Sequence, residues 1–223
     1  MSSYEAVIKD RRPIRTIIAL PATLGCAGLL LSKVRNEFTG LGHFVAYEIL
    51  WWALVALLLC YVRWTERQPL SSIGFRRPGI RNILIGIAAG IVVFAGLAGI
   101  YLVILPALHF KEDPQVTEVM SLILAKPIWW RLTLILRGAI AEEIIFRGYA
   151  IERLRELTGS FRLAGITSCT VFALEHLGVW SWGHVIIAGF AGAMLTLLYI
   201  WRRNLWVNTI AHFVPDAIGL ILG

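Results

Sequence analysis

Charged residues are scarce in this chain of 223 residues. Only 16% of it is Asp, Glu, Lys or Arg, whereas a soluble domain usually has about 25%. Hydrophobic residues account for 58%, and the mean hydropathy is +0.73. The apolar residues occur in blocks close to the roughly 20 residues that a helix needs to cross a bilayer. Because little polar sequence is left to build another domain, we expect a single membrane domain over residues 1–223.

The signatures of several hydrolase classes are also missing. The chain has no GxSxG motif, which would mark an exposed nucleophilic serine, and no HExxH motif of the common zinc metalloproteases. The three cysteines, Cys26, Cys60 and Cys169, have no CxxC or metal-ligand spacing. Asp216 is the only aspartate within an apolar segment, which excludes an intramembrane aspartate dyad. For a hydrolase, water activated by a glutamate or by a metal remains.

The apolar segments predict an all-α fold, a polytopic transmembrane helical bundle with about seven spans. They lie near residues 16–32, 43–62, 82–106, 132–146, 163–177, 183–201 and 205–222. The fourth and fifth segments are short, so we expect them to be tilted, extended by polar turns or buried within the bundle.

The distribution of lysine and arginine predicts how the bundle is oriented. With a cytoplasmic N-terminus, most of the 21 Lys and Arg residues fall on the cytoplasmic side, as the positive-inside rule requires. We therefore expect an integral, multi-pass membrane protein, in the plasma membrane if the host is prokaryotic. The net charge of +7 suits anionic membrane lipids. No nucleic-acid partner is expected, because the basic residues form no single soluble patch.

Ionisable residues recur within three of the predicted spans, where each costs about 2.5–3.5 kcal/mol and so needs a partner or a function. The motifs are Glu142-Glu143-x-x-x-Arg147, Phe172-x-x-x-His176 and His212-x-x-x-Asp216. On an α-helix, Glu143 and Arg147 share a face and can pair as ions, whereas Glu142 is rotated away by about 100°. Three helices could bring Glu142, His176 and His212 together in the cytoplasmic half of the bilayer. By themselves these residues indicate a polar site for hydrolysis or for ion or proton transport.

The three motifs, in this order on three hydrophobic helices, resemble the CPBP family of intramembrane proteases. That family includes type II CAAX prenyl endopeptidases, bacteriocin-processing and immunity proteins, and lysostaphin-resistance-type proteins. The resemblance covers about residues 125–223, which we expect to be the catalytic core. It implies an intramembrane endopeptidase that hydrolyses peptide bonds of membrane-associated proteins, lipidated proteins or peptides.

The resemblance also implies a role for each motif residue. Glu142 corresponds to the general base, and His176 helps to hold the attacking water. His212 and Asp216 correspond to the pair that polarises the scissile carbonyl and stabilises the oxyanion. Glu143, Arg147 and Phe172 are the supporting members of the motifs.

Asp216 stands where the family also has Asn, and this affects the expected chemistry. An ionised Asp cannot donate a hydrogen bond to an oxyanion, so Asp216 would have to be protonated or to orient His212. The same residue suits a metal site, and the family has been described both as metalloproteases and as metal-independent glutamic proteases. We favour a site without a cofactor; the alternative is a divalent metal such as zinc on Glu142, His176 and His212.

Two functions of other classes compete with the protease. One is a non-catalytic immunity or scaffolding protein of the same fold. The other is a proton-coupled transporter, which the lack of an inverted repeat disfavours. Two further ionisable residues belong to no motif: Arg137 is expected to pair with Glu175 or Asp216, and Glu175 to be a packing or cavity residue.

Overall fold

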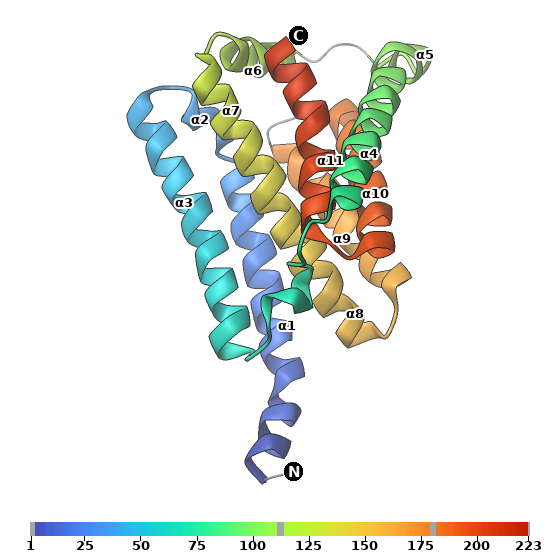
Figure 1. The fold of residues 1–223 in the computed structure, drawn as a ribbon. Coiled ribbons are helices and arrows are strands. Elements are labelled where there is room, and N and C mark those ends of the chain that lie inside the picture. The colour runs from blue at the N-terminus through green and yellow to red at the C-terminus, as the bar shows by residue number, and fades with distance from the viewer. Residues whose placement is uncertain (1–2, 111–113, 179–181, 223) are drawn as a thin grey trace.

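A computed structural model describes residues 3–110, 114–178 and 182–222, and every regular element within these ranges is a helix (Figure 1). The predicted all-α fold is therefore confirmed. The first half contains α1 (Ser3–Leu31), α2 (Val34–Glu37), α3 (Leu41–Cys60), η1 (Tyr61–Thr65), η2 (Leu70–Ile73), α4 (Ile80–Gly99), η3 (Ile100–Ile104) and α5 (Leu105–Ala107). The second half contains α6 (Pro114–Leu124), α7 (Ile128–Arg137), η4 (Gly138–Ile151), α8 (Glu152–Thr158), α9 (Phe161–Glu175), η5 (His176–Gly178), α10 (Trp182–Arg202), α11 (Leu205–Ala217) and η6 (Ile218–Leu222).

Four helices in the described part of the chain are long and apolar enough to cross a membrane. They are Leu41–Thr65, Ile80–Ala107, Trp182–Arg202 and Leu205–Leu222. The apolar part of α1, Thr16–Leu31, is shorter. Several membrane-length apolar helices make the chain an integral, multi-pass membrane protein. The count of seven spans stays a prediction.

The predicted fourth segment is longer than the sequence suggested, because α7, η4 and α8 follow one another without a break from Ile128 to Thr158. Charged residues interrupt its hydropathy, yet the charged side chains at its centre are enclosed by protein: Glu143 and Arg147 are 0% and 1% exposed. Hydropathy measures the cost of moving a side chain from water into an apolar phase, whereas these side chains are surrounded by other helices. The structure also winds η4 as a π-helix, with i→i+5 hydrogen bonds in place of the α-helix that the spacing argument assumed.

The η4 segment of this central helix is almost entirely buried and lies between two groups of helices (Figure 1). It contacts α1 and α3 on one side, and α9 and α11 on another. Helix α11 in turn packs closely on α4, because Gly86 and Gly90 lack side chains there. A Cβ atom at Gly90 would lie only 2.6 Å from the Val214 Cβ. The polar residues of α11 and η4 are therefore held in the interior of the bundle.

Candidate active site

Glu143 is the centre of a buried hydrogen-bond network that joins η4 to α11. Its carboxylate accepts from the Arg147 Nη1 at 2.9 Å and from the Asn208 Nδ2 at 3.0 Å. The His212 Nδ1 lies 2.9 Å from the Glu143 Oε1, which already accepts from Arg147. We call Glu143, Arg147, Asn208 and His212 the Glu143 network. The predicted Glu143–Arg147 ion pair is thus present, with both side chains fully enclosed.

Arg147 extends the network to the second motif. Its guanidinium lies over the Phe172 ring, 4.3 Å from the centroid, and its Nη2 donates to the Gly192 carbonyl at 3.3 Å. The Phe172 ring lies 4.7 Å from the His176 ring, and the Phe172 carbonyl is 2.7 Å from the His176 Nδ1. His176 directly follows the last residue of α9, so the hydrogen bond is made at the end of that helix. When Nδ1 donates to this carbonyl, the opposite nitrogen, Nε2, is left free to accept.

One face of α11 carries three polar residues at intervals of four. Asn208 is fully buried and donates to Glu143 and to the Leu195 carbonyl at 2.7 Å. His212 follows one turn later, and its Nε2 lies 3.6 Å from the Asp216 Oδ2. That distance is too long for a hydrogen bond, so Asp216 is an ion-pair neighbour of the ring. The sequence reasoning missed Asn208, although an amide in an apolar helix one turn before His212 was a visible signal.

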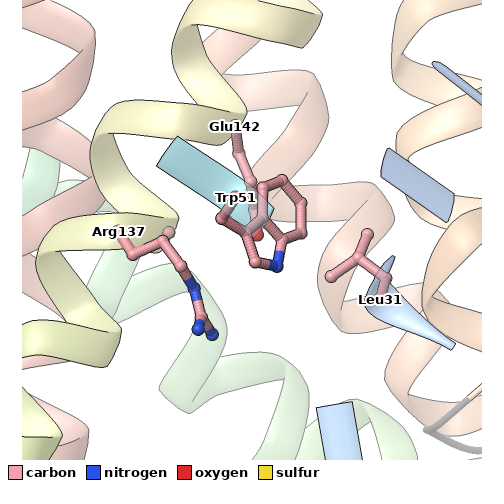
Figure 2. Close-up of a pocket in the computed structure, with 5 residues that line it drawn as sticks. Leu31, Trp51, Arg137 and Glu142 are labelled. Carbon is pink, nitrogen blue, oxygen red and sulfur yellow. The ribbon is translucent and has the colours of Figure 1, made fainter. Parts of the chain in front are cut away.

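Glu142 lies outside the Glu143 network. Within the described ranges its carboxylate has no hydrogen-bond or ion-pair partner, and Oε1 lies over Gly138, where no side chain intervenes. It lines a small pocket, the Glu142 pocket, with room for about one water molecule. The other lining residues are Leu31, Trp51, Arg137 and Gly138. In Figure 2 the Glu142 side chain and the Trp51 ring overlap in the view, with Arg137 on one side of them and Leu31 on the other.

Other charged groups also face the Glu142 carboxylate. It interacts electrostatically with His212, Asp216 and Glu175. No hydrogen bond joins Glu142 to His176 or His212 in the described part of the chain. The structure thus brings His212 and Asp216 toward Glu142, and it connects His176 to the site through Phe172.

The predicted partners of Arg137 are wrong. Arg137 binds Glu37 through both carboxylate oxygens at 3.0 Å and Glu48 at 2.8 Å, and not Glu175 or Asp216. Glu175 instead packs on α1, where a Cβ at Gly28 would lie 3.2 Å from its Cδ. The prediction of Glu175 as a packing residue therefore fits its surroundings.

The alternative of a metal site does not fit the described residues. No group of three or more His, Cys, Asp or Glu side chains among them is arranged to hold a metal ion. The Nδ1 atoms of His212 and His176 are engaged by Glu143 and by the Phe172 carbonyl, so Nε2 is the nitrogen that each ring could offer to a ligand.

His184 lies near the start of α10. Its ring stacks on that of His176 at 6.0 Å between centroids, with 24° between the planes. The second-motif histidine is thus flanked by Phe172 on one side and by His184 on another. Sequence spacing gave no sign of this, because the two histidines come from different helices.

Comparison with known families locates this constellation within one domain. Residues 124–218 match the family described as Type II CAAX prenyl endopeptidase Rce1-like, and they include all three motifs. No curated protein and no solved structure matches the chain. The Rce1-like proteins are intramembrane endopeptidases. Residues 124–218 of this membrane protein therefore form a domain of the Rce1-like type II CAAX prenyl endopeptidase family, also called CPBP.

Proposed function

We propose that the chain is an intramembrane endopeptidase in which Glu142 is the general base that activates the attacking water. One observation carries the proposal: of these two adjacent glutamates, Glu142 is the one whose carboxylate is unpaired among the described residues and lies beside a water-sized pocket. Glu143 has its oxygens occupied by Arg147, Asn208 and His212. A base must be within reach of the proton that it takes, and only Glu142 meets that condition.

In this proposal His212 donates to the oxygen of the scissile carbonyl. Nδ1–H donates to Glu143, so Nε2–H is the donor that remains for the substrate. The Asp216 carboxylate, 3.6 Å from Nε2, lies where it can balance the charge of a doubly protonated ring. A donor fixed by Glu143 before the reaction needs no reorganisation as the oxyanion forms, which is the source of its effect on rate.

His176 has the role of holding the water. Its Nδ1–H is directed to the Phe172 carbonyl, so the lone pair of Nε2 can accept a hydrogen bond from water. The rings of Phe172 and His184 limit its rotation. Glu142 would take one proton of this water, and the hydroxide would attack the carbonyl carbon. The same carboxyl would then return the proton to the leaving amine.

Aromatic residues at the ends of α10 indicate how deep in the membrane the proposed site lies. This helix has 21 residues, about 30 Å at 1.5 Å per residue, which matches the apolar thickness of a bilayer. Trp182 at its start and Trp201 at its end are 64% and 63% exposed, as in the aromatic belts of membrane proteins. His212 lies about 10 Å into α11, whose first residues lie beside the Trp201 end.

Basic residues support the orientation that the sequence predicts. The N-terminal end of α1, the α3–α4 connection and α8 lie at one end of the bundle (Figure 1). Arginines of this end include Arg63, Arg67, Arg153, Arg202 and Arg203. We infer a cytoplasmic N-terminus, with the site in the cytoplasmic half of the membrane. Substrates would be membrane-associated or lipidated chains cut near the cytoplasmic surface.

Purified protein in nanodiscs tests the proposal with two probes, a farnesylated peptide ending in a CaaX sequence and an unmodified transmembrane peptide. Mass spectrometry should show one internal cleavage in at least one probe, lost in Glu142→Gln. Cleavage that persists in Glu142→Gln would overturn the role of Glu142. If neither probe is cut and the protein's effect in its host cell survives Glu142→Gln, the non-catalytic immunity or scaffolding alternative replaces the endopeptidase proposal.

A further inference from the structure

A buried ion cluster lies beside the Glu142 pocket and outside the three motifs. Arg137, at the end of α7, is held by Glu37 of α2 and Glu48 of α3. We call these three residues the Arg137 cluster. Arg137 is 5% and Glu37 0% exposed, so the guanidinium and the carboxylate that it binds through both oxygens are enclosed by protein. Two of the three residues lie outside the region that matches the family.

Such a cluster is poor evidence for stability alone, because apolar residues of similar volume often stabilise a core as well. In some proteins buried polar or ionic groups instead fix one arrangement of the elements that carry them. Here the Trp52 Nε1 donates to the second oxygen of Glu48, so both oxygens of this carboxylate are held. The rotation of α3 about its own axis is thereby set relative to α7.

The residue placed by this rotation is Trp51. Tyr47, Glu48 and Trp51 share a face of α3, and the Arg137 guanidinium lies 5.6 Å and 5.8 Å from the Tyr47 and Trp51 ring centroids. Trp51 is only 2% exposed and lines the Glu142 pocket together with Glu142 (Figure 2). One side chain, Arg137, thus contacts both acids and the ring and also lines the pocket.

We propose that Arg137 is a positioning residue that holds Trp51, through Glu48 and Glu37, as the wall of the catalytic pocket. The N-terminal helices are then part of the active site and not only a membrane anchor. The wall sets the space in which water and the substrate backbone meet Glu142. Its consequence for catalysis rests on the proposed function, whereas the wall itself can be measured without any cleavage.

A double-mutant cycle separates positioning from general stability. In a background with Cys26→Ser, Cys60→Ser and Cys169→Ser, Glu142→Cys reports on the pocket through its rate of labelling by methyl methanethiosulfonate. Arg137→Met should raise that rate about tenfold when Trp51 is present and less than about twofold in Trp51→Ala, because coupled residues are not additive. The same increase in both backgrounds would overturn the proposal.

A second buried arginine provides the matched control. Arg153 is 1% exposed and pairs with Glu66 at 2.7 Å and Glu156 at 3.0 Å, and it does not line the pocket. Arg153→Met should leave labelling within about twofold of the parent, since distant sites act independently. If it raises labelling as much as Arg137→Met, general loosening is the cause and the proposal fails. Should Arg137→Met not fold, Glu48→Gln replaces it in the double-mutant cycle. Glu48→Gln should then raise labelling about tenfold with Trp51 present and less than about twofold in Trp51→Ala.

Kinetics with a cleaved probe then test the catalytic consequence. With the farnesylated peptide, Arg137→Met should raise KM about tenfold and change kcat less than about threefold, and Arg137→Lys should recover part of the KM. A loss in kcat with unchanged KM would contradict a wall that contacts substrate. If labelling follows the cycle but no cleavage depends on Glu142, the proposed function fails while the positioning role stands. If cleavage depends on Glu142 and labelling does not follow the cycle, only the positioning role fails.

Discussion

The Glu142 pocket and the Glu143 network begin at adjacent residues of one helix and differ in almost every physical respect. Glu143 is fully buried and accepts hydrogen bonds from Arg147 and Asn208, with the His212 Nδ1 also in contact. Glu142 is half-buried, unpaired within the described ranges, and faces a pocket of about one water molecule. A carboxylate whose lone pairs are all engaged can fix structure, whereas one with free lone pairs can accept a proton. Two adjacent residues of one π-helical segment are therefore suited to different roles: Glu143 to fixing the structure and Glu142 to accepting a proton.

Among substitutions in the Glu143 network, a change at Arg147 should lower stability the most. In Arg147→Met the Glu143 charge stays buried without its main partner, which should lower the free energy of unfolding by about 3–5 kcal/mol. Unfolding in mixed micelles measures this. Arg155→Met is the control, because Arg155 is 38% exposed and its nearest acid is 3.7 Å away. Its effect should stay within about 0.5 kcal/mol, and equal effects would contradict the structural role of the network.

Asn208 should have the next largest effect. Asn208→Leu removes one hydrogen bond to a charged group and one to a backbone carbonyl, and should cost about 1.5–3 kcal/mol in the same unfolding assay. The neighbouring Thr209→Leu should change stability by less than about 0.5 kcal/mol. A stable Asn208→Leu variant would show that Glu143 does not need this donor.

A smaller effect is expected where the network meets the second motif. A Cβ at Gly192 would lie 2.9 Å from the Phe172 Cδ1, so Gly192→Ala should shift Phe172 and with it His176. We expect kcat/KM for a cleaved probe to fall about tenfold, since small displacements in an active site are costly. At Gly189 the nearest contact of a Cβ would be an ordinary 3.7 Å, so Gly189→Ala should be neutral. Equal rates for both variants would show that His176 is not positioned through Phe172.

Chelation should have the smallest effect. Because no metal-ligand cluster exists among the described residues, incubation with EDTA should leave the cleavage rate within about twofold of the untreated enzyme. Cleavage that stops in chelator and is restored by zinc would support the metal alternative, with Glu142 among the ligands.

Much of this arrangement could be predicted from local spacing. Residues four apart share a helix face, and this was enough to predict the Glu143–Arg147 pair at 2.9 Å and the common face of His212 and Asp216. The order of the three motifs was enough to identify the family over about residues 125–223, and the family model matches residues 124–218.

The remaining features depend on contacts that spacing does not encode. Arg137 finds Glu37 a hundred residues away, in a short helix that belongs to no predicted span. The length of the central helix was hidden, because hydropathy counts charges such as Glu143, Arg147 and Arg153 as solvent-facing although the fold encloses them. Trp51 reaches the pocket from a helix that carries no motif, so only the folded bundle reveals it.

The most direct test of the separation between pocket and network compares Glu142→Gln and Glu143→Gln in one preparation. For each variant, kcat/KM for the cleaved probe and the free energy of unfolding would be measured together. Glu142→Gln should lose at least about 100-fold in kcat/KM with unchanged stability, because removing a general base costs about 10²–10⁴ in rate. Glu143→Gln should lose stability, since Arg147 is left without its carboxylate. An active Glu142→Gln enzyme, or a Glu142→Gln variant destabilised as much as Glu143→Gln, would contradict the account.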